Sequence, residues 1–265
     1  MLGKQLRGEE VVVIGDTPLD VKCGRGAFMH RPADARALAR SMVSIGTAAG
    51  VRTECLITQM DVPLGHAVGN ALEIAECIEV LRGKGPADLI ELVVRLGSRM
   101  VRLANKAATD EESAALVRQA LSSGAALARF RLMVARQGGD PAVVDDPSRL
   151  PSARLKHVMT APRRGVVTAL DALLVGRAAV ALGAGRDKKG DEVDLSAGIV
   201  LLKKPQDEVA AGEPVMELHY NDPSRLAGAL PLVTQAMVIG DQPPATQPLV
   251  LGWVHDSGET MFVVS

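Results

Sequence analysis

The sequence predicts an α/β fold, a partial parallel sheet with flanking helices, followed by a smaller α+β, barrel-like C-terminal domain. Apolar, β-branched runs alternate with amphipathic helical patterns near the start of the chain, which is typical of parallel sheets. Helical patterns fill the middle of the chain, and short β-like runs fill its end. A proline-containing stretch separates the two parts, so we predict a partial α/β domain at 1–139, a linker at 140–151 and a C-terminal domain at 152–265.

The first four predicted elements include the strands and the helix that alternate in an α/β fold. Glu9–Asp16 is apolar and β-branched and is predicted to be a buried strand. Val21–Pro32 is a glycine-rich loop, and Ala33–Gly50 has the apolar spacing of an amphipathic helix closed by a glycine. Val51–Met60 is the next predicted strand.

The later elements change in character along the chain. Helices are predicted to dominate from Ala87 to Gln137, with Asp110 as the N-cap of one of them. In the second part we predict one helix, Asp171–Leu182, among five short β-like runs, which are 165–170, 197–204, 213–220, 248–254 and 261–265.

Composition excludes several classes of function. The net charge is −1, from 30 basic and 31 acidic residues, and only 2% of residues are aromatic, so a dedicated nucleic-acid binder is not expected. No apolar run approaches the ~20 residues of a membrane span. Cys23, Cys55 and Cys77 form no disulfide or metal pattern, and no secretory signal is visible, so a reducing, cytoplasmic location is expected.

The stretch "MDVPLGHAVGNALEIAECIEVLRGKGP", Met60–Pro86, has a distinctive glycine-punctuated turn. Gly65 and Gly69 precede a strong helical pattern, in which three carboxylates recur at every third position: Glu73, Glu76 and Glu79. Read from these residues alone, the carboxylates fit either an ordinary solvated helix face or an ion site at the turn, and the solvated face is favoured.

Four long segments closely resemble the pyrimidine-nucleoside phosphorylases, from about Asp20 to the C-terminus. They are "DVKCGRGAFM", "MDVPLGHAVGNALEIAECIEVLRGKGPADLIEL", "VGRAAVALGAGRDKKGD" and "GIVLLKKPQDEVAAGEPVMELH". The resemblance implies a transferase reaction in which a pyrimidine nucleoside and phosphate, the co-substrate, give the free base and (deoxy)ribose 1-phosphate. Positioning and charge stabilisation would supply most of the catalysis.

The resemblance also implies a monovalent-cation site, usually for potassium. Its ligands would be the backbone carbonyls of Leu64 and Ala67 and the carboxylate of Glu76. Oxygen ligands suit a hard cation. A continuous helix would separate residues 67 and 76 by roughly 13 Å along its axis, so the helix must begin after about Gly69, with the preceding loop folded back. The expected role of the ion is to clip the loop to the helix.

The resemblance further implies that Phe28 forms an apolar wall of the pyrimidine pocket. Phe28 follows the glycine-rich segment "KCGRGA", which could offer N–H groups to an anion or simply form a tight strand-to-helix turn. No catalytic residue is assigned. Cys23 is expected to be inert. The histidines are scattered, and none has a Ser or Asp at a spacing that would indicate a catalytic pair: His30, His66, His157, His219 and His255.

The family signature "SGRG…TGGT" and the phosphate-binding cluster are absent from these 265 residues. We therefore interpret the chain as an N-terminally truncated phosphorylase, matching about the C-terminal three fifths, with impaired activity. The alternative is a non-catalytic remnant or binding module that retains the cation site. The resemblance implies a homodimer, as in full-length relatives, but the oligomeric state of this chain stays open. The preference for thymidine or uridine as substrate stays open as well.

Two further readings concern the ends of the chain. Leu6–Gly26 is similar to the last motif of haloacid dehalogenase-like phosphatases, where Asp16 and Asp20 would hold Mg²⁺, but the upstream nucleophilic aspartate is missing. Lys4 alone could match a pyrimidine-contacting lysine of the phosphorylases. The C-terminal runs are similar to biotinyl and lipoyl carrier hairpins without their lysine motif, so Lys188–Lys189 and Lys203–Lys204 are predicted to be loop charges.

Overall fold

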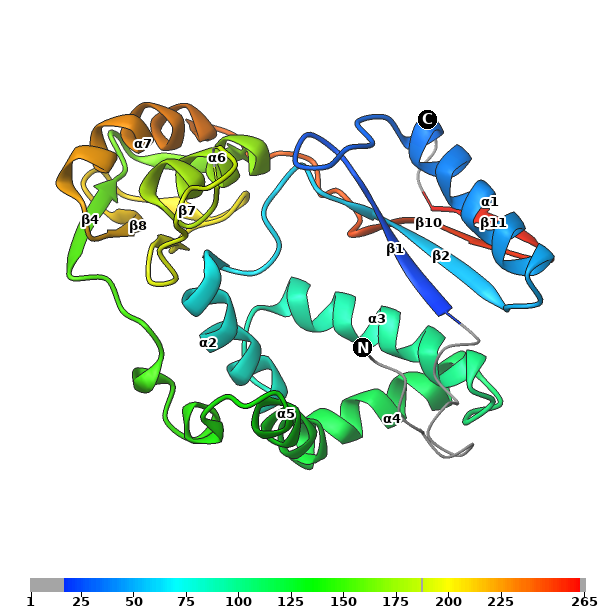
Figure 1. The fold of residues 1–265 in the computed structure, drawn as a ribbon. Coiled ribbons are helices and arrows are strands. Elements are labelled where there is room, and N and C mark those ends of the chain that lie inside the picture. Colours follow the sequence, from blue (N-terminus) through cyan, green and yellow to red (C-terminus); the bar gives the residue numbers. More distant parts are fainter. Residues whose placement is uncertain (1–16, 187, 263–265) are drawn as a thin grey trace.

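The computed structural model describes residues 17–186 and 188–262, and its ribbon is shown in Figure 1. Its first sheet begins with a β–α–β unit. Strands β1 (Thr17–Cys23) and β2 (Thr53–Gln59) are parallel, and α1 (Pro32–Ala48) connects them. Helix α1 packs its small side chains Ala35 and Ala39 against this sheet, where both are fully buried.

The start of the chain differs in detail from the sequence prediction. The strand predicted at Glu9–Asp16 lies outside the described residues. The predicted loop Val21–Pro32 is wrong at its beginning, because β1 continues to Cys23. The strand extends because Val21 and Cys23 point into the core beneath α1, as alternate residues of a strand do.

Two strands from the far end of the chain complete the first sheet. Its order is β1-β2-β10-β11, with β10 (Val250–His255) antiparallel to β2 and β11 (Gly258–Met261) antiparallel to β10. The predicted domain at 152–265 included these strands, whereas their pairing places them in the N-terminal sheet. Leu251 and Val254 are buried in the core beneath α1, and this burial explains why the end of the chain returns to the first sheet.

Four helices form a layer beside this sheet, drawn in cyan and green in Figure 1. They are α2 (Asn70–Leu81), α3 (Ala87–Leu103), α4 (Asp110–Ser122) and α5 (Ala125–Arg136). The helical prediction for this part of the chain is confirmed, although the N-cap of α4 is Thr109, whose side chain accepts from the Glu112 N–H, rather than Asp110. Helix α3 packs against α4 and lies next to β1.

The linker holds two short 3₁₀ helices, η1 (Pro141–Val144) and η2 (Pro147–Arg149), and leads into the C-terminal domain. This domain has two helices, α6 (Ala172–Leu182) and α7 (Pro223–Ala236), which pack together. The prediction missed α7, because Gly228 and Pro231 interrupt its helical pattern. Asp222 as N-cap and Pro223 at N1 nevertheless give it a standard beginning.

Two open sheets accompany these helices in the described part of the chain, and neither closes into a barrel. Their orders are β3-β6-β8-β4 and β7-β5-β9. The strands are β3 (Ala67–Val68), β4 (Leu155–Thr160), β5 (Gly165–Leu170), β6 (Gly198–Leu201), β7 (Glu208–Val209), β8 (Pro214–Tyr220) and β9 (Met237–Gly240). The core that these sheets and helices share is fully buried, with 0% exposure for Val175, Leu182, Ile199 and Leu218.

Within residues 17–186 and 188–262, no helix is both long and apolar enough to cross a membrane.

Candidate functional site

The glycine turn before α2 folds back as the sequence requires. Gly65 has φ +68° and Gly69 has φ +130°, values that favour glycine. Helix α2 begins at Asn70, immediately after Gly69, so the predicted start of the helix is confirmed. Val68 and Ala67, between the two glycines, form the short strand β3, which adds to the edge of the C-terminal sheet beside β6.

Glu76 reaches back from α2 to this turn. Its Oε1 accepts a hydrogen bond from the backbone N–H of His66 at 2.8 Å. A Cβ at position 65 would overlap Oε2 of the same carboxylate and push it aside, and the φ of +68° also favours glycine there. The turn and the carboxylate are therefore in direct contact, although they are ten residues apart in sequence.

The orientation of the Ala67 carbonyl follows from the pairing of β3 with β6. The Leu201 N–H donates to the His66 carbonyl at 2.7 Å, so the carbonyl of residue 66 points toward β6. In an antiparallel ladder the next pair, Ala67 with Val200, is non-hydrogen-bonded. The N–H and C=O of Ala67 are therefore turned away from β6, and the carbonyl is not used by this ladder.

Lys204 and Asp88 hold the other side of the turn. Lys204 Nζ donates to the carbonyls of Pro63 at 2.8 Å and Gly65 at 2.9 Å, and it forms an ion pair with Asp88. Asp88 Oδ2 also accepts from the Gly65 N–H at 3.2 Å. Lys204 lies in the loop between β6 and β7, as predicted, but its side chain is only 17% exposed and is bonded to the turn instead of being solvated.

The other two carboxylates of α2 have local partners. Glu73 accepts from the Gly69 N–H at 2.9 Å, and Glu79 pairs with Arg82. Among the described residues, no group of three or more His, Cys, Asp or Glu side chains could hold a metal ion. A site built mainly from backbone carbonyls, as the resemblance implies here, does not require such a group.

The glycine-rich loop is bonded to the segment just before this turn, and Phe28 at its end is 98% exposed. The loop itself is fixed: the Arg25 N–H donates to Asp61 at 2.8 Å, and the Arg25 guanidinium pairs with Asp171 at 2.9 Å. Burial, followed by the nearby charges of Asp61 and Asp34, raises the pKa of the Cys23 thiol, which accords with its expected inertness.

A cavity of about 930 Å³ lies between the first sheet, the N-terminal half of α3 and the C-terminal domain. Leu64 and Lys204 line it, as do Arg25 and Asp171, whereas Phe28 does not. The structure thus brings Glu76 into contact with the turn that holds Leu64 and Ala67, whereas Phe28 lies outside the cavity lining. Sequence reasoning missed Asp88 and Lys204 because a charge in a helix or loop gives no sign of a distant partner.

Comparison with known proteins now identifies the class. Residues 6–127 match the family described as "Glycosyl transferase family, a/b domain", and residues 166–240 match "Pyrimidine nucleoside phosphorylase C-terminal domain". The chain therefore matches two domain families, one in each half of its length. The first match begins at residue 6, so it contains the whole of Leu6–Gly26, the segment that is similar to phosphatases.

Individual relatives give the family. Pyrimidine-nucleoside phosphorylases of Staphylococcus aureus strains USA300, NCTC 8325 and bovine RF122 are each 51% identical to this chain over 203 residues. The alignments cover 77% of this chain and 47% of each relative. The chain thus spans about half the length of the curated relatives it matches, and it belongs to the pyrimidine-nucleoside phosphorylase family.

Proposed function

We propose that this chain carries part of the machinery for phosphorolysis of a pyrimidine nucleoside such as thymidine. In that reaction a phosphate oxygen bonds to C1′ of the sugar while the C1′–N bond breaks, and the base leaves with the electron pair. The family membership supports the reaction, because the relatives are named pyrimidine-nucleoside phosphorylases. Phe28, exposed at the end of the glycine loop, is proposed to contact the base.

We further propose a monovalent-cation site, with potassium as the ion, at the turn between Leu64 and Ala67. The carbonyls of those two residues and the Glu76 carboxylate would hold the ion, which would clip the turn to α2. The contact of Glu76 with the Gly65–His66 backbone is the observation that carries this proposal. The Ala67 carbonyl, turned away from β6, also fits the site.

Activity of this 265-residue chain by itself is proposed to be impaired. The family signature "SGRG…TGGT" does not occur in the sequence, and the relatives are about twice as long as the matched part. The alternative is a non-catalytic binding module that retains the cation site. A cytosolic location is proposed as well, which Cys23, Cys55 and Cys77 support because all three are free thiols.

A base-release assay with thymidine, uridine and phosphate separates the two functions. We expect turnover below roughly 1 s⁻¹, which is under the ordinary enzyme range. A Staphylococcus aureus relative serves as the active control. Turnover comparable to that relative would overturn the proposed impairment, and no base release at all would favour the binding module.

The cation site is tested by thermal unfolding in potassium chloride and in choline chloride at equal ionic strength. An ion that binds the folded state raises the melting temperature. We expect a potassium-specific rise that is lost in Glu76→Ala. Glu79→Ala is the matched control, since Glu79 lies one turn further along α2 and pairs with Arg82. An equal rise in Glu76→Ala would remove the site.

A further inference from the structure

We propose that Lys204 is a positioning residue: it holds the turn at Pro63–Ala67 in the conformation that the cation site requires. This inference rests on the proposed function, because it assigns to Lys204 the ordering of the same site. Lys204 belongs to the connection between β6 and β7 in the C-terminal domain, whereas the turn precedes α2. The contact therefore joins two segments about 140 residues apart.

The donors of Lys204 are fully used at the turn. An ammonium group has three N–H donors and no acceptor. Here the three go to the carbonyls of Pro63 and Gly65 and to the carboxylate of Asp88. An apolar side chain at position 204 would leave two partly buried carbonyls and one carboxylate without this donor, and leaving such groups unpaired is costly.

Asp88, the partner of Lys204, also fixes the amide of Gly65. Its Oδ2 accepts from the Gly65 N–H, and its Oδ1 accepts from the Leu89 N–H at 2.8 Å. Both backbone groups of Gly65 are thus bonded, one to Asp88 and one to Lys204, at the residue whose φ of +68° sets the bend. The Lys204–Asp88 pair is neutral, so the negative charge of Glu76 remains to balance a monovalent ion.

A fixed turn matters because the proposed ion ligands are mostly backbone oxygens. Carbonyls that are already aimed at the ion bind it without a further loss of conformational entropy. A turn released from Lys204 must be ordered again each time the ion binds. The apparent affinity for potassium should then fall, while the identity of the ligands stays the same.

The first measurement is the potassium concentration that gives half of the rise in melting temperature. Lys204→Met should increase this concentration about tenfold, and Lys204→Arg should restore part of the affinity, because a guanidinium keeps donors and charge. Lys203→Met is the matched control, since Lys203 pairs with Glu213 at 2.7 Å and does not bond to the turn. An unchanged half-effect concentration in Lys204→Met overturns the inference and leaves the cation site standing.

The second measurement is amide hydrogen exchange at Gly65 and His66, which reports local opening of the turn independently of any ion. We expect at least tenfold faster exchange in Lys204→Met, with core amides such as that of Ile57 unchanged, so that global unfolding is excluded. Unchanged exchange at the turn overturns the inference. Faster exchange in a protein that shows no potassium response removes the cation site but supports the hold of Lys204 on the turn.

Discussion

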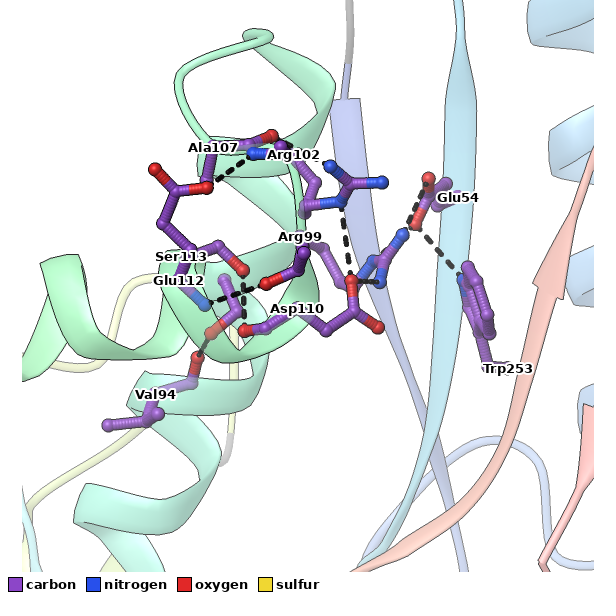
Figure 2. Close-up of polar contacts among 12 residues, drawn as sticks. Glu54, Val94, Arg99, Arg102, Ala107, Asp110, Glu112, Ser113 and Trp253 are labelled. Atoms are coloured by element: carbon purple, nitrogen blue, oxygen red, sulfur yellow. Dashed lines mark hydrogen bonds and ion pairs between the residues drawn. The ribbon is translucent and has the colours of Figure 1, made fainter.

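Helix α3 is fastened at both ends by a carboxylate–cation pair, but the two ends are built differently. At its N-terminus, Asp88 pairs with Lys204 and the pair bonds to backbone groups of the glycine turn. In its C-terminal half, Arg99 pairs with Glu54 of β2 through two hydrogen bonds, of 2.6 and 3.1 Å. Figure 2 shows this second attachment, with Trp253 of β10 beside it.

The Arg99 attachment is a fork of side chains packed between elements. The Trp253 Nε1–H donates to Glu54 at 3.0 Å, and the Arg99 guanidinium lies 4.2 Å from the centre of the Trp253 ring. Asp110 at the start of α4 adds a third anchor, with Arg99 Nη1 at 2.9 Å from its Oδ1. This end joins the helical layer to strands β2 and β10.

The same kind of interaction therefore serves two purposes in this protein. A bidentate pair between rigid elements stabilises the fold, whereas a lysine bonded to carbonyls controls the shape of a turn. Variants at the Arg99 end should therefore change the free energy of unfolding more than they change potassium affinity. Variants at the Lys204 end should do the reverse.

The largest effect is expected for Arg99→Met. The side chains of Arg99 and Glu54 are only 12% and 14% exposed, and removing one partner leaves a partly buried charge unpaired. We expect a loss of about 3 kcal/mol in the free energy of unfolding, measured by urea denaturation. Arg95→Met is the control, since Arg95 lies one turn away with a 62% exposed side chain. Equal losses in the two variants would contradict a special role for the fork.

A smaller effect is expected for Trp253→Phe. The change removes the hydrogen bond to Glu54 and weakens the attraction between the ring and Arg99. The expected loss is about 1–2 kcal/mol in the same urea experiment. In a double-mutant cycle with Arg99→Met, the two losses should be less than additive, because both variants break one network. Strict additivity would show that the contacts act independently.

The smallest effect is expected at Asp88, and it depends on pH. Burial opposes the charged form, but hydrogen bonding to Lys204, the charge of Lys204 and the N–H groups of Leu89 and Gly65 outweigh it and lower the pKa of Asp88. The stabilisation is therefore present above the unfolded pKa of about 4, and it is lost as the pH falls through the folded value.

The variant Asp88→Asn should thus be less stable than the parent protein at pH 7, by about 1 kcal/mol, and the gap should close on acidification. Urea midpoints measured from pH 7 to pH 3 give the comparison. A gap that stays constant over this range would show that the Asp88 charge contributes nothing.

Local patterns made much of this fold predictable. The periodicity of Ala87–Gln137 indicates helices, and the glycines before Asn70 require a bend there. Partners across long sequence separations were not predictable. The run at Val250–His255 reads as a strand without showing that it pairs with β2. Likewise, Arg99 reads as a surface charge of an amphipathic helix, because its partner Glu54 is 45 residues away.

In the candidate site, too, contacts close in sequence were predictable and contacts distant in sequence were not. Glu76 and the turn are close in sequence, so a family resemblance and helix geometry together placed them. Lys204 comes from another domain, and only the folded chain brings its amine to the carbonyls of Pro63 and Gly65. Pattern reading treats such a lysine as a solvated charge, because solvated charges are the commoner case.

The return of β10 to β2 has a consequence for how the protein is made. During synthesis, β2 leaves the ribosome almost 200 residues before its antiparallel neighbour exists. The β6–β8 pair and the helices that close the C-terminal core can meet earlier, over shorter loops. The edge of β2 that later pairs with β10 therefore stays unpaired throughout most of translation. Slow pairing across such distances exposes a nascent chain to aggregation. A chain that ends at residue 249 holds every helix and strand of the C-terminal core, whereas its first sheet lacks β10 and β11.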